Sequence, residues 1–177
     1  MLFSSEQVSN GHPDKICDQI SDAIVTDILA HDKKARIAAE VCIKDYDIII
    51  LGEITSTYIP DYQSLVMGVL RNIGLEDLDK YKVQELISAQ SPDIAMGVDN
   101  DGAGDQGMMF GYATNETEEY MPYAISLAHK LTKKLTEVRK NGTLPYLRAD
   151  GKSQVSVEYD ENNQPVRLEA VVISTQH

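Results

Sequence analysis

The chain has 177 residues, which is enough for one well-packed core or for two small ones. Hydrophobic residues make up 42% and charged residues 25%, as in soluble globular proteins, and no apolar run approaches the length of a membrane span. The net charge of −12 disfavours nucleic acid and anionic membranes as partners. Cys17 and Cys42 are expected to be buried free thiols, and the chain opens with no signal-peptide pattern, so we expect a cytoplasmic protein.

The first predicted element is a helix over residues 12–31, because isoleucines recur at every fourth position from Ile16 to Ile28. Its first turn carries His12, Pro13, Asp14 and Lys15. Proline suits the first helical position, and the N-terminus of a helix attracts anions because its first N–H groups lack partners. An imidazole and a carboxylate at such an end predict a nucleotide-triphosphate site that works through a divalent cation. A capping histidine and an acid that compensates the helix dipole are the plainer alternatives.

Two strands are predicted next, over residues 36–44 and 47–56, with Asp45 and Tyr46 as the turn. A two-residue turn places Glu40 opposite Leu51 and brings Glu53 onto the same face of the sheet as Glu40. Two acids on strands rich in isoleucine and valine indicate a bound cation, either a metal or a substrate ammonium. The alternative is a solvated face.

The later elements are a helix over residues 60–73 that ends at Gly74, a short helix near 79–89, and a loop-like stretch over 90–111. A helix from about 121 to 142 and a hairpin of residues 153–159 and 166–174 complete the chain. The last helix is predicted to bury Ile125, Ala128, Leu131, Leu135 and Val138. This order predicts an α+β fold with helices layered on mixed or antiparallel sheets. The strand-like final residues suggest a sheet that something else completes.

Two further segments carry polar residues that suit a ligand. Gly102, Gly104 and Gly107 match the spacing of a dinucleotide fingerprint, but no strand precedes them, so that interpretation is rejected. We expect instead that these glycines let the backbone approach a ligand to which Asp105 is directed, with an ordinary tight turn as the alternative. Lys152 follows Asp150 and Gly151, and is either a phosphate-binding lysine or a surface lysine at a turn.

Seven segments in this order resemble the methionine adenosyltransferase, or S-adenosylmethionine synthetase, family, and the resemblance spans essentially the whole chain. These segments are residues 9–15 (Ser-Asn-Gly-His-Pro-Asp-Lys), 52–55 (Gly-Glu-Ile-Thr), 90–94 (Gln-Ser-Pro-Asp-Ile), 102–116 (from Gly-Ala-Gly-Asp-Gln-Gly to Asn-Glu), 139–145 (Arg-Lys-Asn-Gly-Thr-Leu-Pro), 152–155 (Lys-Ser-Gln-Val) and 174–177 (Ser-Thr-Gln-His). The resemblance implies a fold of repeated α/β units of the S-adenosylmethionine synthetase type.

The resemblance also implies an activity and a set of site residues. Members of the family make S-adenosylmethionine from ATP and L-methionine and then hydrolyse the tripolyphosphate by-product, which requires alignment of the sulfur with the ribose 5′ carbon and stabilisation of a highly charged leaving group. By this resemblance, residues 90–104 gate the site. The implied roles are catalysis for His12 and Lys152, ATP binding for His12, Asp105, Asp150, Gly151 and Lys152, methionine binding for Glu53, Gln90 and Asp105, Mg²⁺ binding for Asp14, and K⁺ binding for Glu40.

The chain departs from the family in two respects. The loop between Asp99 and Gly102 is shorter than in the commonest bacterial form, and family members are about twice as long as this chain. We therefore expect residues 1–116 to form a first α/β unit with a gating loop near 90–104, and residues 117–177 to form part of a second unit that another chain completes.

The expected protein is thus one subunit of a split synthetase, a hetero-oligomer built on the family-type dimer and active only with a second polypeptide that supplies the C-terminal half. The opening Met1 favours a natural subunit. A non-catalytic regulatory or scaffold subunit on the same fold is the alternative, and a truncated, degenerate copy is a third possibility.

Overall fold

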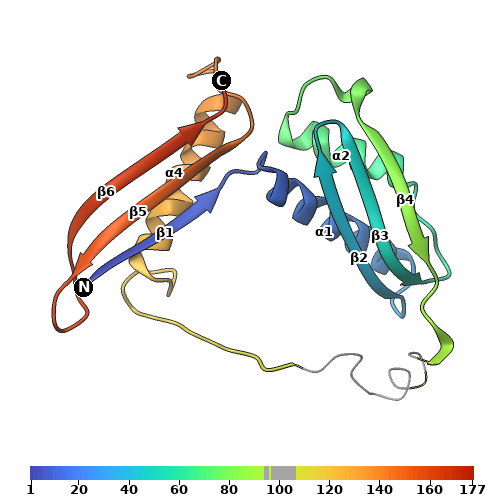
Figure 1. The fold of residues 1–177 in the computed structure, drawn as a ribbon, viewed down its shortest axis with the longest axis horizontal. Coiled ribbons are helices and arrows are strands. Elements are labelled where there is room, and N and C mark those ends of the chain that lie inside the picture. Colours follow the sequence, from blue (N-terminus) through green and yellow to red (C-terminus); the bar gives the residue numbers. More distant parts are fainter. Residues whose placement is uncertain (94–95, 97–106) are drawn as a thin grey trace. The chain divides into compact units, whose positions relative to one another are not determined.

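The structure is a computed structural model that describes residues 1–93, 96 and 107–177 (Figure 1). Positions 94–95 and 97–106, among them Asp105 and much of the expected gating loop, lie outside the described residues. The chain divides into two compact units, each built on a three-stranded sheet. Unit 1 comprises Met1–Lys15, Ile73–Leu75 and Gly111–His177, and unit 2 comprises Ile16–Asn72 and Glu76–Phe110. The predicted α+β class, with helices on mixed and antiparallel sheets, is confirmed.

The sheet of unit 1 has the strand order β1-β5-β6, with all pairs antiparallel. The strand β1, Leu2–Val8, was not expected from the sequence. Its residues Leu-Phe-Ser-Ser-Glu-Gln-Val lack a clear apolar alternation, and most of its side chains are exposed. It forms because the central strand β5, Gly151–Tyr159, offers its backbone along the whole length of β1, from the pair Leu2–Glu158 to the pair Val8–Lys152.

The third strand of this sheet, β6, Pro165–Thr175, pairs with β5 through a hairpin, as predicted. In the turn, Asn163 has a φ of 56° and the carboxylate of Asp160 accepts hydrogen bonds from the N–H groups of Asn162 and Gln164, both at 2.8 Å. Most side chains of β6 are exposed.

The helix α4, Tyr123–Lys140, packs on β5 and forms the core of unit 1 with it. Its most buried positions are Ala124, Ser126, Ala128 and Thr132. The predicted stripe was therefore partly wrong, because Ala128 alone of its five members is fully buried, and Ile125 and Leu131 lie at the border of the core. Small residues at the centre of the contact let the helix approach closely enough for the Ser153 hydroxyl to donate to the Ala128 carbonyl at 2.8 Å.

Unit 2 packs the helix α1, Pro13–His31, and the helix α2, Tyr62–Ile73, on one face of the sheet β2-β3-β4 (Figure 1). The predicted stripe of α1 is confirmed, since Ile16, Ile20, Ile24 and Ile28 are all buried. The helix α2 ends at Gly74, which has a φ of 86°, as expected of a glycine that stops a helix.

The strands β2, Arg36–Lys44, and β3, Asp47–Thr55, form the predicted hairpin in the predicted register. Glu40 lies opposite Leu51 and Ala38 opposite Glu53, so that Glu40 and Glu53 share one face. The turn residue Asp45 takes a left-handed conformation with a φ of 54°, which aspartate tolerates better than most residues.

The helix expected near residues 79–89 is wrong. A short 3₁₀ turn, η1, Leu78–Lys80, is followed by the strand β4, Lys82–Ser88, which runs parallel to β3. The sequence Lys-Val-Gln-Glu-Leu-Ile-Ser contains good helix formers, but it is too short to be stable as a helix, and pairing with β3 overrides local propensity. Among the described residues, no helix is both long and apolar enough to cross a bilayer.

Candidate functional site

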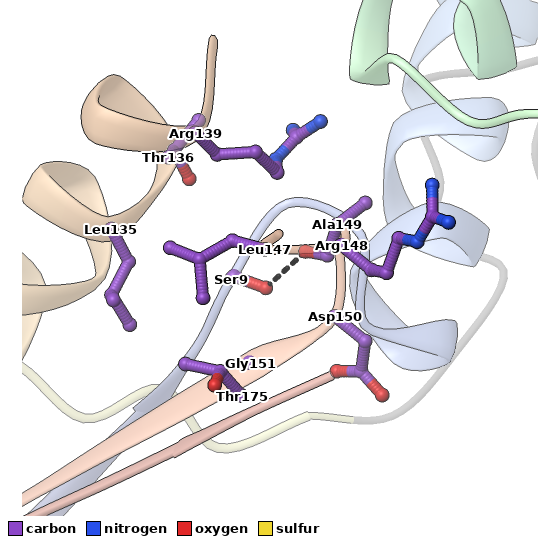
Figure 2. A pocket seen from close by; sticks show the side chains of 10 residues that line it. All are labelled: Ser9, Leu135, Thr136, Arg139, Leu147, Arg148, Ala149, Asp150, Gly151 and Thr175. Atoms are coloured by element: carbon purple, nitrogen blue, oxygen red, sulfur yellow. Dashed lines mark hydrogen bonds between the residues drawn. The ribbon is translucent and has the colours of Figure 1, made fainter. Parts of the chain in front are cut away.

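The pairing of β1 with β5 brings the His12 segment to the residues just before β5. Because the two strands are antiparallel, the end of β1 meets the start of β5, with Val8 opposite Lys152. Beyond this pair, the Ser9 N–H donates to the Gly151 carbonyl at 2.8 Å, and the Ser9 hydroxyl donates to the Ala149 carbonyl at 2.7 Å (Figure 2). Residues that are 140 positions apart in the sequence are thus joined at one end of the sheet.

The contact is tight enough to require a glycine at position 11. A β-carbon on Gly11 would lie 2.3 Å from the Ala149 Cβ and 2.6 Å from the Ala149 carbonyl oxygen. The next residue is fixed by a hydrogen bond from the His12 N–H to the Ser9 carbonyl at 3.1 Å. The backbone that carries His12 is therefore held against the start of β5.

His12 caps the helix α1. Its Nδ1 accepts a hydrogen bond from the Asp14 N–H at 3.2 Å, and it lies 3.8 Å from the Asp14 carboxylate. Since Nδ1 accepts, the hydrogen-bond network places the proton of a neutral ring on Nε2, which leaves an N–H donor available for an anion. The His12 side chain is 14% exposed and that of Asp14 is 85% exposed, so the imidazole is fixed while the carboxylate is open to ligands.

Asp150 carries a polar atom without a partner. Its Oδ1 is buried and has no hydrogen bond in the part of the chain that the structure describes. Its backbone, by contrast, is well ordered: the Asp150 carbonyl accepts from the Gln176 N–H at 3.0 Å, and Gln176 accepts in turn from the Arg148 N–H at 2.9 Å. A buried carboxylate oxygen without a donor is costly, which marks this position as a place where a ligand donor or a cation would be stabilised.

Two hollows adjoin Asp150. One, of about 270 Å³, is lined by Asp150, Gly151, Lys152, Ser174, Thr175 and Gln176. The other, between α4 and residues 147–151, has a volume of about 10 Å³ and has room for one water at most (Figure 2). The larger hollow is smaller than the roughly 300–1,000 Å³ of typical ligand sites, so it suits one part of a ligand, such as a phosphate group or a sugar.

Lys152 lies at the rim of the larger hollow. Its side chain is exposed, and it forms no ion pair among the residues described. An ammonium group without an ion-pair partner in an acidic protein is suited to bind an anionic ligand. His12, Asp14, Asp150, Gly151 and Lys152 all belong to unit 1, and the segments that carry them meet where β1 ends and β5 begins; their shared phosphate site stays a prediction.

Two other predicted residues, Glu53 and Gln90, lie on or just beyond the sheet of unit 2. Glu53 is paired with Ser88 of β4, and Gln90 follows two residues later. The Gln90 side-chain oxygen accepts from the Arg36 Nε at 2.7 Å, and its N–H donates to the Thr55 hydroxyl at 3.2 Å, so that Gln90 is held at the end of the sheet where Glu53 lies. Asp105 lies outside the described residues and cannot be placed here.

The face that carries Glu40 and Glu53 is not buried in unit 2. Glu40 is exposed and Glu53 is half-buried. Burial within this unit therefore does not by itself force these acids to take a cation, and the cation site stays a prediction. The exposure of Glu40 also fits the alternative of a solvated face.

Residues that suit a metal are few in the described part of the chain. It contains no cluster of three or more histidine, cysteine, aspartate or glutamate side chains that could hold an ion. A lone exposed carboxylate such as Asp14 nevertheless fits Mg²⁺, which keeps several waters and binds through one or two carboxylates together with substrate phosphates. Glu40 offers a single carboxylate, so a K⁺ ion bound there would need further oxygen ligands from other groups.

Sequence reasoning missed Ser9 and the steric role of Gly11. Their importance follows from the contact with Ala149, which depends on the unexpected strand β1. The one local signal was that both residues precede His12 in the Ser-Asn-Gly-His segment.

The fold is that of an α+β protein in which the segments of β1 and β5 meet at one end of the first sheet. Residues 1–92 match the N-terminal domain of S-adenosylmethionine synthetase, and residues 100–177 match the central domain of S-adenosylmethionine synthetase. The chain belongs to the S-adenosylmethionine synthetase family.

Curated relatives support the same assignment. The chain is 52% identical to an S-adenosylmethionine synthase of Clostridium tetani (strain Massachusetts / E88) and 52% identical to one of Clostridium botulinum (strain Alaska E43 / Type E3). Each alignment covers 99% of this chain and 50% of the relative. The chain therefore spans about half the length of these relatives. Both alignments extend over 196 positions, more than the 177 residues of this chain, so the relatives carry extra residues within the aligned region.

Proposed function

We propose that this chain provides half of a methionine adenosyltransferase, which makes S-adenosylmethionine from ATP and L-methionine and then hydrolyses the tripolyphosphate. The observation that carries this proposal is the β1–β5 register, which holds His12, Asp150 and Lys152 at one end of a sheet in a chain of this family. None of these three side chains is part of the hydrophobic core, so a non-catalytic scaffold would not need them.

In the proposed reaction, the sulfur of methionine attacks the ribose 5′ carbon of ATP, and the bond from that carbon to the triphosphate oxygen breaks. The sulfur is a neutral nucleophile that already has a lone pair, so no general base is needed. The chief requirement is to stabilise the charge that collects on the departing triphosphate. His12 donates to that oxyanion through Nε2–H, and the Lys152 ammonium binds a phosphate oxygen.

Asp14 and Asp150 complete the ATP side of the proposed site. Asp14 holds Mg²⁺, which supplies positive charge to the polyphosphate when bound. The unpartnered Oδ1 of Asp150 accepts a hydrogen bond from a donor on the nucleotide, which would satisfy the buried oxygen. Gly151 has no side chain and therefore lets the nucleotide approach the backbone between Asp150 and Lys152.

On the methionine side, we assign Glu53 and Gln90 to the amino acid and Asp105 to methionine or the ribose. Glu53 and Gln90 lie at the same end of their sheet, which supports a shared ligand. Glu40 is assigned to K⁺. Residues 90–104 are proposed to gate the site.

The rest of the active site is proposed to come from a second polypeptide in a hetero-oligomer built on the family-type dimer. This rests on the coverage of the relatives, of which this chain accounts for 50%. The test is to assay conversion of ATP and methionine to S-adenosylmethionine with the chain alone, with the unmatched half of the Clostridium tetani synthase alone, and with the two together. Turnover is expected only from the mixture, and robust turnover by the chain alone would overturn partner dependence.

Substitution of His12 by Asn in the assembled complex separates the enzyme from a regulatory or scaffold subunit. We expect S-adenosylmethionine formation to be lost while assembly, measured by native mass spectrometry, is intact. An unchanged rate would favour the scaffold.

A further inference from the structure

Unit 2 contains a second cavity that the proposed reaction does not use. It has a volume of about 390 Å³ and is lined by the end of β3, by β4 and by residues 56–62. The lining side chains that matter here are Ile54, Tyr58, Ile59, Tyr62, Glu85 and Ile87. Side chains alternate along a strand, so Ile54 faces away from the side of the sheet that carries Glu53. Neither Glu53 nor Gln90 lines the cavity, although their neighbours Ser88 and Ala89 do, and its volume falls within the roughly 300–1,000 Å³ of small-molecule sites.

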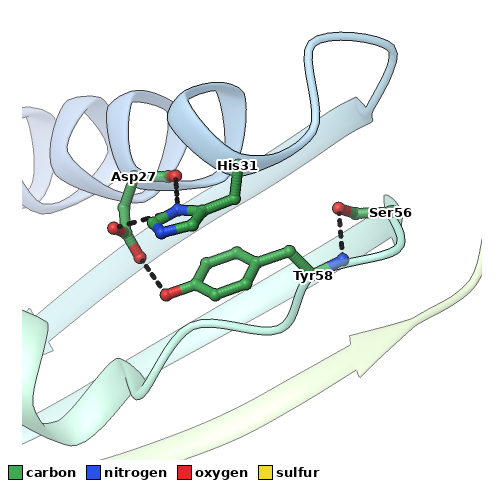
Figure 3. Close-up of polar contacts among 4 residues, drawn as sticks. All are labelled: Asp27, His31, Ser56 and Tyr58. Atoms are coloured by element: carbon green, nitrogen blue, oxygen red, sulfur yellow. Dashed lines mark hydrogen bonds and ion pairs between the residues drawn. The ribbon is translucent and has the colours of Figure 1, made fainter.

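One wall of the cavity is rigid. The Tyr58 ring stacks on the His31 ring, with 3.9 Å between the centroids and 14° between the planes (Figure 3). The Tyr58 hydroxyl donates to the Asp27 carboxylate at 3.1 Å, and the Tyr58 N–H donates to the Ser56 hydroxyl at 3.0 Å. An aromatic surface held at both ends is preorganised, which lowers the entropic cost of binding a ligand against it.

Two polar groups in the cavity have no protein partner. Tyr62 is only 5% exposed, yet its hydroxyl forms no hydrogen bond among the described residues. Glu85 forms neither a hydrogen bond nor an ion pair within the same described part of the chain. The Tyr62 hydroxyl oxygen is not itself fully enclosed, and Glu85 is exposed, so both groups are open to a polar group of a ligand in the cavity.

The charge around the cavity is negative. The ionised groups that act on Tyr58 and Tyr62 are Asp27, Asp61 and Glu85. Burial first, and Glu85 second, raise the pKa of Tyr62, so its hydroxyl stays protonated at neutral pH and neutral toward a cation. The remaining lining is aliphatic or aromatic except for Ser56 and Ser88, and Ile59 is 80% exposed.

We propose that this cavity binds a small organic cation, a primary amine with a hydrocarbon body. Its ammonium group pairs with the Glu85 carboxylate and donates a hydrogen bond to the Tyr62 hydroxyl oxygen. Its hydrocarbon body lies against Tyr58, Ile54 and Ile87. Such an amine would contact both polar groups and the apolar walls at once, whereas an anion would be repelled by the acids.

The probe for this proposal is 2-phenylethylamine, with 2-phenylethanol and 3-phenylpropionate as neutral and anionic controls of similar shape. Binding to the whole chain is followed by NMR of isoleucine methyl groups, which report at Ile54, Ile59 and Ile87. We expect saturable shifts with the amine and much weaker effects with the alcohol and the acid. Equal binding of the amine and the alcohol would refute a cation site, and absence of saturable shifts with the amine would refute the site altogether.

Two variants locate the charge and the hydroxyl. Glu85→Gln is expected to weaken amine binding by at least about tenfold, as loss of a charge-assisted hydrogen bond does. Tyr62→Phe is expected to weaken it several-fold without loss of stability, because no protein hydrogen bond is removed. Glu161→Gln, in the β5–β6 turn, makes the same change in net charge and should leave binding unchanged. Unaltered affinity in Glu85→Gln, with the fold intact by circular dichroism, would overturn the assignment. These measurements need no enzymatic activity, so they are independent of the proposed function.

Discussion

Gly11 lies so close to Ala149 that a β-carbon on the glycine would sit 2.3 Å from the β-carbon of the alanine. Two segments that are far apart in the sequence meet at this point, and the contact fixes the backbone of His12 relative to Asp150. The loop that bears the imidazole is thus built into the fold of unit 1.

Replacement of Gly11 by Ala should destabilise unit 1, because the added methyl group has no space. We expect a loss of about 1–3 kcal/mol in the free energy of unfolding, typical of overpacking. Gly111→Ala is the matched control, since its β-carbon would meet nothing within 4 Å. Urea unfolding monitored by circular dichroism measures both, and equal stability of the two variants would contradict the tight contact.

The hydrogen bond between Glu116 and Tyr159 should make the free energy of unfolding depend on pH under acidic conditions. Partial burial alone would raise the pKa of Glu116, but hydrogen bonds from Tyr159, from the Tyr123 N–H and from Thr114 outweigh it and lower the pKa below 4.5. A lowered pKa contributes stability above the pKa of the unfolded chain, and this is lost as the pH falls through the folded value. Urea unfolding at a series of pH values measures this effect. Glu116→Gln should reduce the fall in the free energy of unfolding at low pH, whereas Glu161→Gln should not.

The same pair acts in the opposite direction at high pH. Burial and the hydrogen bond to Glu116 raise the pKa of Tyr159 from 10.0 to about 12. The folded state therefore holds the phenolic proton more tightly, and stability should fall as the pH rises from 10 towards 12. Tyr159→Phe should lose about 1–3 kcal/mol at neutral pH, the usual effect of deleting a hydrogen bond to a charged group, and should show a weaker decline in alkali. A spectroscopic titration of tyrosine ionisation checks the shifted group directly.

Asp32 should be needed to hold the segment that leads from β3 towards α2. Its carboxylate accepts hydrogen bonds from the Thr57 N–H at 2.8 Å, the Thr57 hydroxyl at 3.0 Å and the Ser56 hydroxyl at 3.2 Å. The first of these bonds is the chief cause of its lowered pKa. Asp32→Ala should lower the melting temperature, and the effect should diminish below the normal carboxyl range, whereas Asp22→Ala, on the outer side of α1, should change little. Equal melting temperatures at pH 7 would contradict this role.

Lys152 should contribute to the binding of polyphosphate. Calorimetric titration of the chain with inorganic tripolyphosphate and Mg²⁺ at low ionic strength should show weaker binding for Lys152→Ala, by roughly tenfold, because a charge-assisted contact is lost. Lys133→Ala, an exposed lysine on α4, removes the same charge and is the control. If the two variants lose affinity equally, the effect is one of net charge and not of a specific contact.

The parts of the fold that the sequence predicts are those with a local cause. The α1 stripe repeats every fourth residue, and the β2–β3 register follows from alternation and a two-residue turn. The strand β1 has no such pattern and depends on β5, more than 140 residues away. The strand β4 was mistaken for a helix because its own residues favour one, while its parallel partner β3 is not visible in a local window.

The candidate site divides in the same way. His12 and Asp14 could be predicted from a helix N-terminus, and Asp150 and Lys152 from a resemblance to a family. The unpartnered Oδ1 of Asp150 and the contact of Ser9 with Ala149 could not, since both depend on tertiary packing. The cavity beside Tyr62 was likewise invisible in the sequence, because Glu85 lies on a strand that had been taken for a helix.

The interleaving of the two units has a consequence for synthesis. Since β1 pairs only with β5 in the described sheet, β1 stays without its partner strand after synthesis until residue 159 has emerged from the ribosome. Meanwhile the elements from α1 to β4 can close their own core. At translation rates of about 5–20 residues per second, the roughly 150 residues between the two strands leave β1 an unpaired strand for about 8–30 seconds, the interval in which a chaperone would be most useful.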